Sequence, residues 1–320
     1  MTDSQNNPLP SLKIVVLSGG ESAEREISLQ SGEAVSHVLS SRGHQVKTVD
    51  PSLIDLDTYD WGDCDVVFIA LHGTYGEDGT IQTTLDRLGI PYSGCDAATS
   101  KLAFSKSASK ERFIQHNVNT PSYVLIHESD NAKRIAQHAR SMGYPLVVKP
   151  DAQGSSLGVS IVQTPEELPQ ALARCFHYDS FGILESAIKG TEWTVSVVDG
   201  QVLPLIQIQT PHDFFDYEAK YHEDSTQYLF EFDLPTNVIQ SIIKTGVNAC
   251  EALGTTGIVR VDLLLDRFQQ PWVLEVNTIP GFTDHSLVPK AAAQAGIDFG
   301  ELCERALAEC LTQAAHKPHN

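Results

Sequence analysis

A β-branched run that ends in a pair of glycines lies near the amino terminus and constrains the fold most. Residues 13 to 18 read K-I-V-V-L-S, and Gly19-Gly20 follows directly. The next segment carries apolar residues at helical spacing as far as Gly43, which predicts a helix. Strands are also predicted at 45 to 49 and 64 to 71. This order is typical of a parallel sheet with helices packed against it, so we expect an α/β domain over residues 1–95.

A different pattern begins after this domain. A helical pattern over 96 to 116 precedes two strands and a second helix, the last strand ending at Pro150. The stretch D-A-Q-G-S-S-L-G at 151 to 158 then runs straight into V-S-I-V-Q. A glycine-rich turn between two strands predicts a hairpin, and we therefore expect a separate α+β domain over residues 96–188.

The third predicted domain covers residues 189–320 and opens with a hairpin whose turn is Asp199-Gly200. Its segment 210–230 is rich in charge and aromatics without periodicity, and a loop of that length in a compact domain is often a lid. The further expected elements are a helix capped by Thr236 and stopped by Gly254, strands at 258 to 265 and 272 to 276, and a terminal helical stretch through about Cys310.

Polar residues alternate along the last two predicted strands. Arg260 and Asp262 share one face of the first strand, and Glu275 and Asn277 share one face of the second. If the strands pair antiparallel, Asp262, Glu275 and Asn277 converge, and oxygen ligands of this kind suit Mg²⁺. The solvated face of an edge strand shows the same alternation, so the spacing alone leaves a metal site and a plain surface equally open.

The glycine-rich loop and the lysine before it have the chemistry to bind phosphate. Gly154 allows close approach of the backbone, Ser155 and Ser156 add hydroxyls, and Lys149 ends the preceding strand. The loop is not a Walker A sequence, because no G-K-[ST] follows. An ordinary hairpin turn explains the same residues when they are taken alone.

Two residues lie just beyond predicted strands of the first domain, at the sheet edge where α/β proteins bind ligands. Glu24 follows the glycine pair, and His72 follows the buried strand. Glu24 is suited to binding a substrate ammonium, but an acid at the start of a helix also stabilises the helix by interacting with its dipole. A lone histidine is usually structural. The G-x-G-x-x-G spacing of a dinucleotide-binding fold is absent after Gly19.

Charge and composition exclude several classes of protein. The 22 Lys and Arg against 41 Asp and Glu give a net charge of −19 at pH 7, which argues against nucleic-acid and anionic-membrane partners. The six cysteines include no C-x-x-C pair and are expected to be buried, reduced thiols. The longest apolar run, 66 to 71, is far shorter than a membrane span. We expect a cytoplasmic protein.

Six motifs in order resemble the ATP-grasp superfamily and, within it, the D-alanine-D-alanine ligase family, from about Lys13 to Cys310. They are G-G-E-S-A-E-R-E-I-S-L-Q-S-G (19–32), A-L-H-G-T-Y-G-E-D-G (70–79), V-V-K-P-D-A-Q-G-S-S-L-G-V-S (147–160), F-D-Y-E-A-K-Y (215–221), R-V-D-L-L-L-D (260–266) and L-E-V-N-T-I-P-G-F-T-D-H-S-L-V-P (274–289). The resemblance implies a three-domain architecture, α/β and α+β, that holds ATP between two antiparallel sheets. It also implies that ATP phosphorylates the carboxylate of one D-alanine, and that the amine of a second attacks the acyl phosphate to make a peptidoglycan precursor.

The resemblance implies roles for individual residues. For D-alanine, Glu24 would hold the first ammonium with His72 nearby, Arg260 and the N–H of Gly281 would stabilise the oxyanion, and Ser286 and Leu287 would receive the second carboxylate. For ATP, the phosphates would meet Lys106, Lys149, Lys220, Gly154, Ser155 and Ser156, while Glu185 and Glu192 would address adenine and ribose. Asp262, Glu275 and Asn277 would hold two Mg²⁺ or Mn²⁺. Tyr221 would hydrogen-bond to Ser155, which reaches Glu24 and so latches the lid.

The resemblance leaves alternatives for the reaction. Ligases that make D-alanyl-D-lactate have a lid without this tyrosine, so Tyr221 favours D-alanine as the nucleophile. Ser105 stands where the family usually has an acid before the lysine, which weakens the assignment of Lys106. The rivals are a ligase that makes a depsipeptide or a mixed dipeptide, an ATP-binding module without turnover and, least supported, an NAD-binding oxidoreductase. The family also implies a homodimer.

Overall fold

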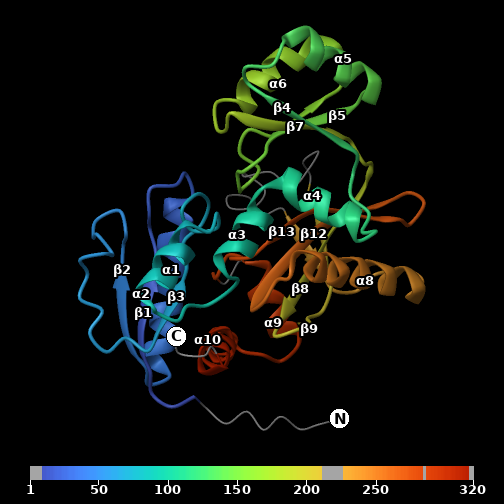
Figure 1. The fold of residues 1–320 in the computed structure, drawn as a ribbon. Coiled ribbons are helices and arrows are strands. Elements are labelled where there is room, and N and C mark those ends of the chain that lie inside the picture. Colours follow the sequence, from blue (N-terminus) through green and yellow to red (C-terminus); the bar gives the residue numbers. More distant parts are fainter. Residues whose placement is uncertain (1–8, 211–225, 284–285, 317–320) are drawn as a thin grey trace.

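A computed structural model describes residues 9–210, 226–283 and 286–316 of the chain. Within them lie three β-sheets flanked by helices (Figure 1). Lys220 and Tyr221, which are predicted to belong to a lid, lie outside the described residues. The mixture of one parallel and two antiparallel sheets confirms the predicted fold class.

The first sheet is parallel and has the order β2-β1-β3. Its strands are β1 (Lys13–Leu17), β2 (Gln45–Val49) and β3 (Val66–Ile69), with α1 (Arg25–Ser41) after β1 and α2 (Thr80–Leu88) after β3. The strand–turn–helix order is as predicted. Helix α2 is an addition to the prediction, and its N-cap is Gly79, which has a left-handed φ of 88°.

The second sheet is antiparallel, with the order β4-β7-β5-β6, and forms the upper body in Figure 1. Strand β5 pairs with β6, which confirms the hairpin around the glycine-rich loop. The elements are β4 (Tyr123–His127), α5 (Ala132–Met142), β5 (Leu146–Pro150), β6 (Ser160–Val162), a 3-10 turn (Pro165–Glu167), α6 (Leu168–Cys175) and β7 (Phe181–Ser186).

The third sheet has the order β11-β10-β8-β12-β13, with β9 paired to β8. The predicted turn at Asp199-Gly200 joins β8 to β9, and the two strands predicted near the carboxyl terminus pair antiparallel, with Asp262 opposite Glu275. The strands are β8 (Gly190–Val198), β9 (Gln201–Val202), β10 (Ile206–Gln209), β11 (Gln227–Leu229), β12 (Ile258–Asp266) and β13 (Pro271–Asn277).

Two helices, α3 (Ala97–Phe104) and α4 (Lys106–Gln115), connect the first sheet to the second along the chain. The helical pattern over 96 to 116 divides into these two helices because Ser105 adopts an extended backbone between them. Both pack against the third sheet and its helix α8 (Thr236–Leu253). Pro235, and not the predicted Thr236, is the N-cap of α8, while Gly254 ends it in the left-handed conformation as predicted.

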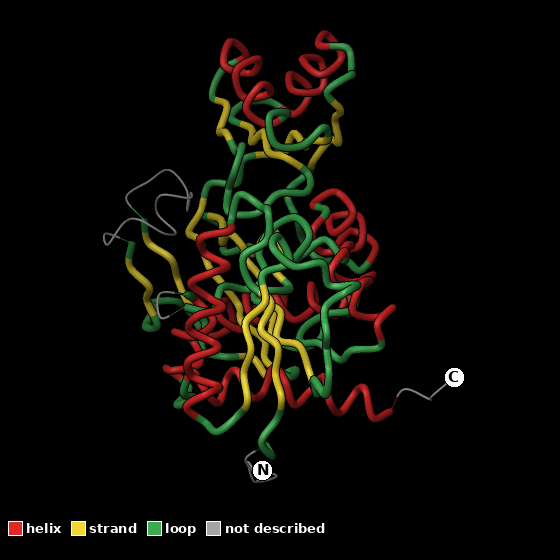
Figure 2. Tube along the Cα trace, turned by 90° about the vertical axis from the view of Figure 1, so that its left-hand side faces the viewer, coloured by secondary structure: helices red, strands yellow, loops and turns green. Residues whose placement is uncertain are grey.

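The terminal helical stretch is two helices, α9 (Leu287–Gln294) and α10 (Phe299–His316). Helix α10 packs against α1 and β3 of the first sheet, and both views place it beside that sheet (Figures 1 and 2). One apolar core therefore contains Val35 and Leu39 of α1 together with Leu302 and Leu307 of α10, all four of them fully buried. None of the described helices is long and apolar enough to cross a membrane.

Candidate active site

Two cavities meet at the centre of the molecule. The larger has a volume of about 780 Å³ and lies between the two antiparallel sheets, with Val147 and Ile161 on one side and Leu264 and Leu274 on the other. The smaller, of about 80 Å³, lies between the first and third sheets. The glycine-rich loop separates the two, since Gln153 and Ser156 line the large cavity while Gly154 and Ser155 line the small one. Glu275 lines both.

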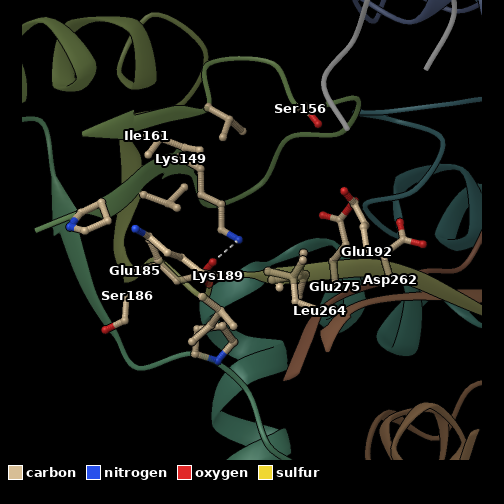
Figure 3. Close-up of a pocket in the computed structure, with 18 of the residues that line it drawn as sticks. Lys149, Ser156, Ile161, Glu185, Ser186, Lys189, Glu192, Asp262, Leu264 and Glu275 are labelled. Carbon is tan, nitrogen blue, oxygen red and sulfur yellow. Dashed lines mark hydrogen bonds and ion pairs between the residues drawn. The ribbon is translucent and has the colours of Figure 1, made fainter. Parts of the chain in front are cut away.

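Lysines of the large cavity are held by acids and carbonyls. Lys149 points to Glu185 (Figure 3), and its Nζ donates to Oε1 at 2.8 Å. The Lys106 Nζ donates to the carbonyl oxygen of Gln153 at 2.6 Å and lies 3.3 Å from Glu275 Oε2. The predicted residues Lys106, Lys149, Ser156, Glu185 and Glu192 therefore line one cavity. Lys189 lines it too and was not predicted.

The acid missing before Lys106 is supplied from another segment. Asp151 lies at the start of the glycine-rich loop, and its carboxylate accepts hydrogen bonds from the Ser105 hydroxyl and from the N–H of Ser107, each at 2.7 Å. An anion at this position stabilises the amino terminus of α4. The sequence departure at Ser105 thus leaves a carboxylate beside the helix that carries Lys106.

The polar face of β12 and β13 gathers oxygen ligands beside the large cavity (Figure 3). Asp262 is buried and accepts from Thr194 Oγ1 at 2.9 Å and from Asn277 Nδ2 at 3.2 Å. Arg260 makes a bidentate contact with the same carboxylate: its Nε donates to Oδ1 at 2.9 Å and its Nη2 donates to Oδ2 at 2.8 Å. Mg²⁺ prefers carboxylate and amide oxygens, so the donor set of Asp262, Glu275 and Asn277 fits Mg²⁺ in its chemistry.

The small cavity is built around Glu24. This buried carboxylate accepts a hydrogen bond from the Ser155 hydroxyl, as the proposed latch requires. Ser155 and Ser156 have left-handed φ values of 51° and 57°, a strained conformation that clusters at functional sites. A Cβ at Gly154 would lie 2.6 Å from Glu24 Oε2, so only glycine lets the loop come this close.

A chain of hydrogen bonds orients His72 in this cavity. The backbone N–H of Phe282 donates to Ser31 Oγ at 3.4 Å, and the same oxygen lies within hydrogen-bond distance of His72 Nε2, at 3.1 Å. On the other side of the ring, His72 Nδ1 lies 3.5 Å from Glu77 Oε1. Neither Ser31 nor Glu77 was predicted, although both lie inside quoted motifs.

The glycine turn that carries Glu24 is held by Asp50. Its carboxylate accepts from the N–H of Gly20 at 3.0 Å and from Arg25 Nη2 at 2.6 Å. Burial by itself would raise the pKa of Asp50, but the hydrogen bonds from Arg25, Gly20 and Ser52 outweigh burial and hold the pKa well below its usual range. The ion pair thus fixes the start of α1.

The other predicted substrate residues also line the small cavity: His72, Arg260, Gly281, Ser286 and Leu287. Ser286 is the N-cap of α9, and its hydroxyl accepts from the N–H of Thr283 at 3.1 Å. Tyr228 of β11 lines this cavity as well and was not predicted, because three residues carry no periodic signal.

Two antiparallel sheets that enclose a cavity containing lysines and a face of oxygen donors define an ATP-grasp protein. Comparisons with known proteins specify the class further. Residues 55–95 match the family described as "D-ala D-ala ligase N-terminus", and residues 113–308 match "D-ala D-ala ligase C-terminus". The chain belongs to the D-alanine-D-alanine ligase family.

Individual relatives agree with this assignment. A D-alanine–D-alanine ligase of Bordetella avium is 41% identical over 301 residues, which are 93% of this chain and 94% of the relative. The crystal structure of a D-alanine–D-alanine ligase from Bacillus anthracis is 35% identical, covers 96% of this chain and 100% of its own, and has a TM-score of 0.86; a second structure of that enzyme is complexed with ATP. The VanG D-Ala:D-Ser ligase of Enterococcus faecalis is 27% identical, with coverage of 93% and 99% and a TM-score of 0.81.

Proposed function

We propose that this chain joins two molecules of D-alanine to D-alanyl-D-alanine at the expense of ATP, releasing ADP and phosphate, in the cytoplasm, for peptidoglycan synthesis. The observation that carries the proposal is the position of the glycine-rich loop between two cavities, one of nucleotide size and one small and polar. A phosphate bound under this loop would face both. Transfer of the phosphoryl group from ATP to the substrate then needs no movement of either reactant, and positioning of this kind is a large part of catalysis.

The reaction has two balanced steps. A carboxylate oxygen of the first D-alanine attacks the terminal phosphorus of ATP, the bond to ADP breaks, and an acyl phosphate forms. The amine of the second D-alanine then attacks the acyl carbon, and loss of phosphate and a proton leaves the dipeptide. Arg260 and the N–H of Gly281 would stabilise the charge that develops on the acyl oxygen, because both line the small cavity.

The remaining assignments are those that the family resemblance implies. Glu24, with His72 nearby, would hold the first ammonium, and Ser286 and Leu287 would receive the second carboxylate. Lys106, Lys149 and Lys220, with Gly154, Ser155 and Ser156, would bind phosphates, and Glu185 and Glu192 would bind adenosine. Asp262, Glu275 and Asn277 would hold Mg²⁺ or Mn²⁺, which when bound neutralises phosphate charge. Tyr221 would close the lid on Ser155. We further propose domains over 1–95, 96–188 and 189–320 and a homodimer.

A substrate-pair assay tests this function. Purified protein with ATP and Mg²⁺ is given D-alanine alone, D-alanine with D-lactate, or D-alanine with D-serine, and both ADP release and product mass are measured. We expect D-alanine alone to support turnover and to give the homodipeptide. Turnover that requires D-lactate or D-serine would refute the proposed second substrate, and ATP binding without any turnover would favour the binding module.

A further inference from the structure

A lysine that solvent does not reach lies next to the large cavity. Lys110 is one turn after Lys106 on α4 and is 0% exposed. Lysine is almost never fully buried unless its charge is paired. The Lys110 side chain is not among those that line the large cavity. Its burial therefore has a reason other than direct contact with a nucleotide.

Residues of the second sheet, and of the segment that leads into it, surround the Lys110 ammonium. Its Nζ lies 2.6 Å from Glu185 Oε2 and donates to Thr120 Oγ1 at 2.6 Å. The Thr120 hydroxyl donates onward to the carbonyl oxygen of Val273, at 2.9 Å. The ring of Tyr123 lies 5.9 Å from the same nitrogen, within the range of a cation–π contact. The ammonium is therefore fixed in place.

Glu185 is bound by two lysines, one at each oxygen. Lys149 donates to Oε1 at 2.8 Å from the cavity side, and Lys110 faces Oε2 from the buried side. Burial by itself would raise the pKa of Glu185, but the charges of Lys149 and Lys110 outweigh it and hold the pKa below its usual value. Burial lowers the pKa of Lys110 to about 8, while the charge of Glu185 acts in the opposite direction. The carboxylate thus stays ionised.

The two lysines differ in what they can do when ATP arrives. Lys149 lines the cavity, but its ammonium is held by Glu185 in this structure. If Lys149 turned to a phosphate and no other cation were present, a carboxylate that is 2% exposed would be left unpaired, which is strongly unfavourable. Lys110 removes this obstacle because it stays where it is.

We propose that Lys110 is a positioning residue of the nucleotide site: it is the permanent counter-ion of Glu185 and thereby frees Lys149 for the phosphates of ATP. The proposal rests on the proposed function, since it assumes that the large cavity binds ATP. It predicts that loss of Lys110 ties Lys149 to Glu185 and weakens ATP binding. The binding of D-alanine, in the other cavity, should hardly change.

The test compares Lys110→Met, Lys110→Arg, Glu185→Gln and the double variant Lys110→Met/Glu185→Gln. ATP affinity is measured by calorimetric titration with Mg²⁺ and without D-alanine, and KM values for ATP and D-alanine come from ADP release. We expect Lys110→Met to weaken ATP affinity at least tenfold with the KM for D-alanine changed less than twofold. Lys110→Arg, which keeps the charge, should stay within threefold of the original chain. Lys133→Met on the exposed side of α5 is the matched control and should change neither value.

The double variant separates positioning from a merely structural role. Once Glu185 is neutral, Lys149 is free, so the double variant should bind ATP as well as Glu185→Gln does, and this comparison holds even if Lys110→Met alone does not fold. A further loss of affinity in the double variant, or unchanged ATP affinity in Lys110→Met, would overturn the proposal. If ATP binds but D-alanine gives no ADP, the proposed function fails, while the affinities still decide the role of Lys110.

Discussion

At the scale of single residues, Ser31 connects His72 of the small cavity to Phe282, which is 210 positions further along the chain than His72. Its hydroxyl lies between the N–H of Phe282 and His72 Nε2. We predict that Ser31→Ala raises the KM for D-alanine about fivefold, since loss of one hydrogen bond costs about 1 kcal/mol, and leaves the KM for ATP unchanged. Ser40→Ala on the exposed side of α1 is the control. Equal changes in both KM values would show a general loss of structure.

Asp50 predicts how stability depends on pH. Its pKa is lower in the folded chain than its ordinary value of 3.8. Its stabilising contribution is therefore fully present above pH 3.8 and is lost as the pH falls towards the folded pKa. We expect the free energy of unfolding of Asp50→Asn, from urea titrations, to fall less between about pH 4 and pH 2 than that of the original chain. Asp233→Asn, at an exposed position, should keep the original slope.

Sequence reasoning reached those site residues whose chemistry is visible in a short motif. Glu24, Ser155, Asp262 and Glu275 are of this kind: each has an ordinary structural explanation when taken alone, and the six motifs in order are what assigned it a function. Lys110 was not predicted, because a lysine on a helix is normally expected to be exposed to solvent. Its partner Glu185 lies 75 positions later in the sequence, and only the fold brings the two together.

At the scale of elements, the β12–β13 pair carries the oxygen donors. The register places Glu275 opposite Asp262, as the alternation predicted. We predict that Glu275→Gln lowers turnover at least a hundredfold and raises the Mg²⁺ concentration needed for half-maximal rate, with the melting temperature kept. The change keeps the volume of the side chain but removes a charge that attracts the cation. Glu251→Gln on α8 is the exposed control, and an unchanged Mg²⁺ dependence of Glu275→Gln would remove the metal assignment.

Periodicity predicted the strands better than the helices. Strands β1, β5 and β12 are runs of apolar residues with little ambiguity. Helix α2 reads T-I-Q-T-T-L-D-R-L, and threonine has a low helix propensity. The helix forms because Ile81 and Leu85, both fully buried, pack in the core of the first sheet, and a tertiary reason of this kind is not visible in the local sequence.

At the scale of the whole molecule, the first and last segments share one core. Leu307 of α10 is fully buried among residues of α1, β1 and β3. We predict that Leu307→Ala lowers the free energy of unfolding by about 2–5 kcal/mol, the usual cost of such a cavity, in a urea titration. Leu53→Ala, at a side chain that is 77% exposed, should change it by less than about 0.5 kcal/mol. Similar values for the two variants would show that α10 contributes little to this core.

The path of α10 also explains why the sequence order of domains is an incomplete guide to this fold. The predicted boundaries follow changes of pattern along the chain, and such patterns do not reveal where a terminal helix packs. The salt bridge between Arg42 Nη2 and Glu304 Oε2, at 2.9 Å, joins α1 to α10 across this interface. Neither residue lies in a motif, so neither gave a signal.

The core that α1 shares with α10 limits the order in which the parts of a newly made chain can fold. The ribosome releases α1 and its parallel sheet first, and domains commonly fold in that order during synthesis. Here the apolar side of α1 is completed by α10, which is translated after all the other described elements. We therefore expect a nascent chain arrested before Phe299 to expose this surface and to bind chaperones, and the amino-terminal body to be the last to become native.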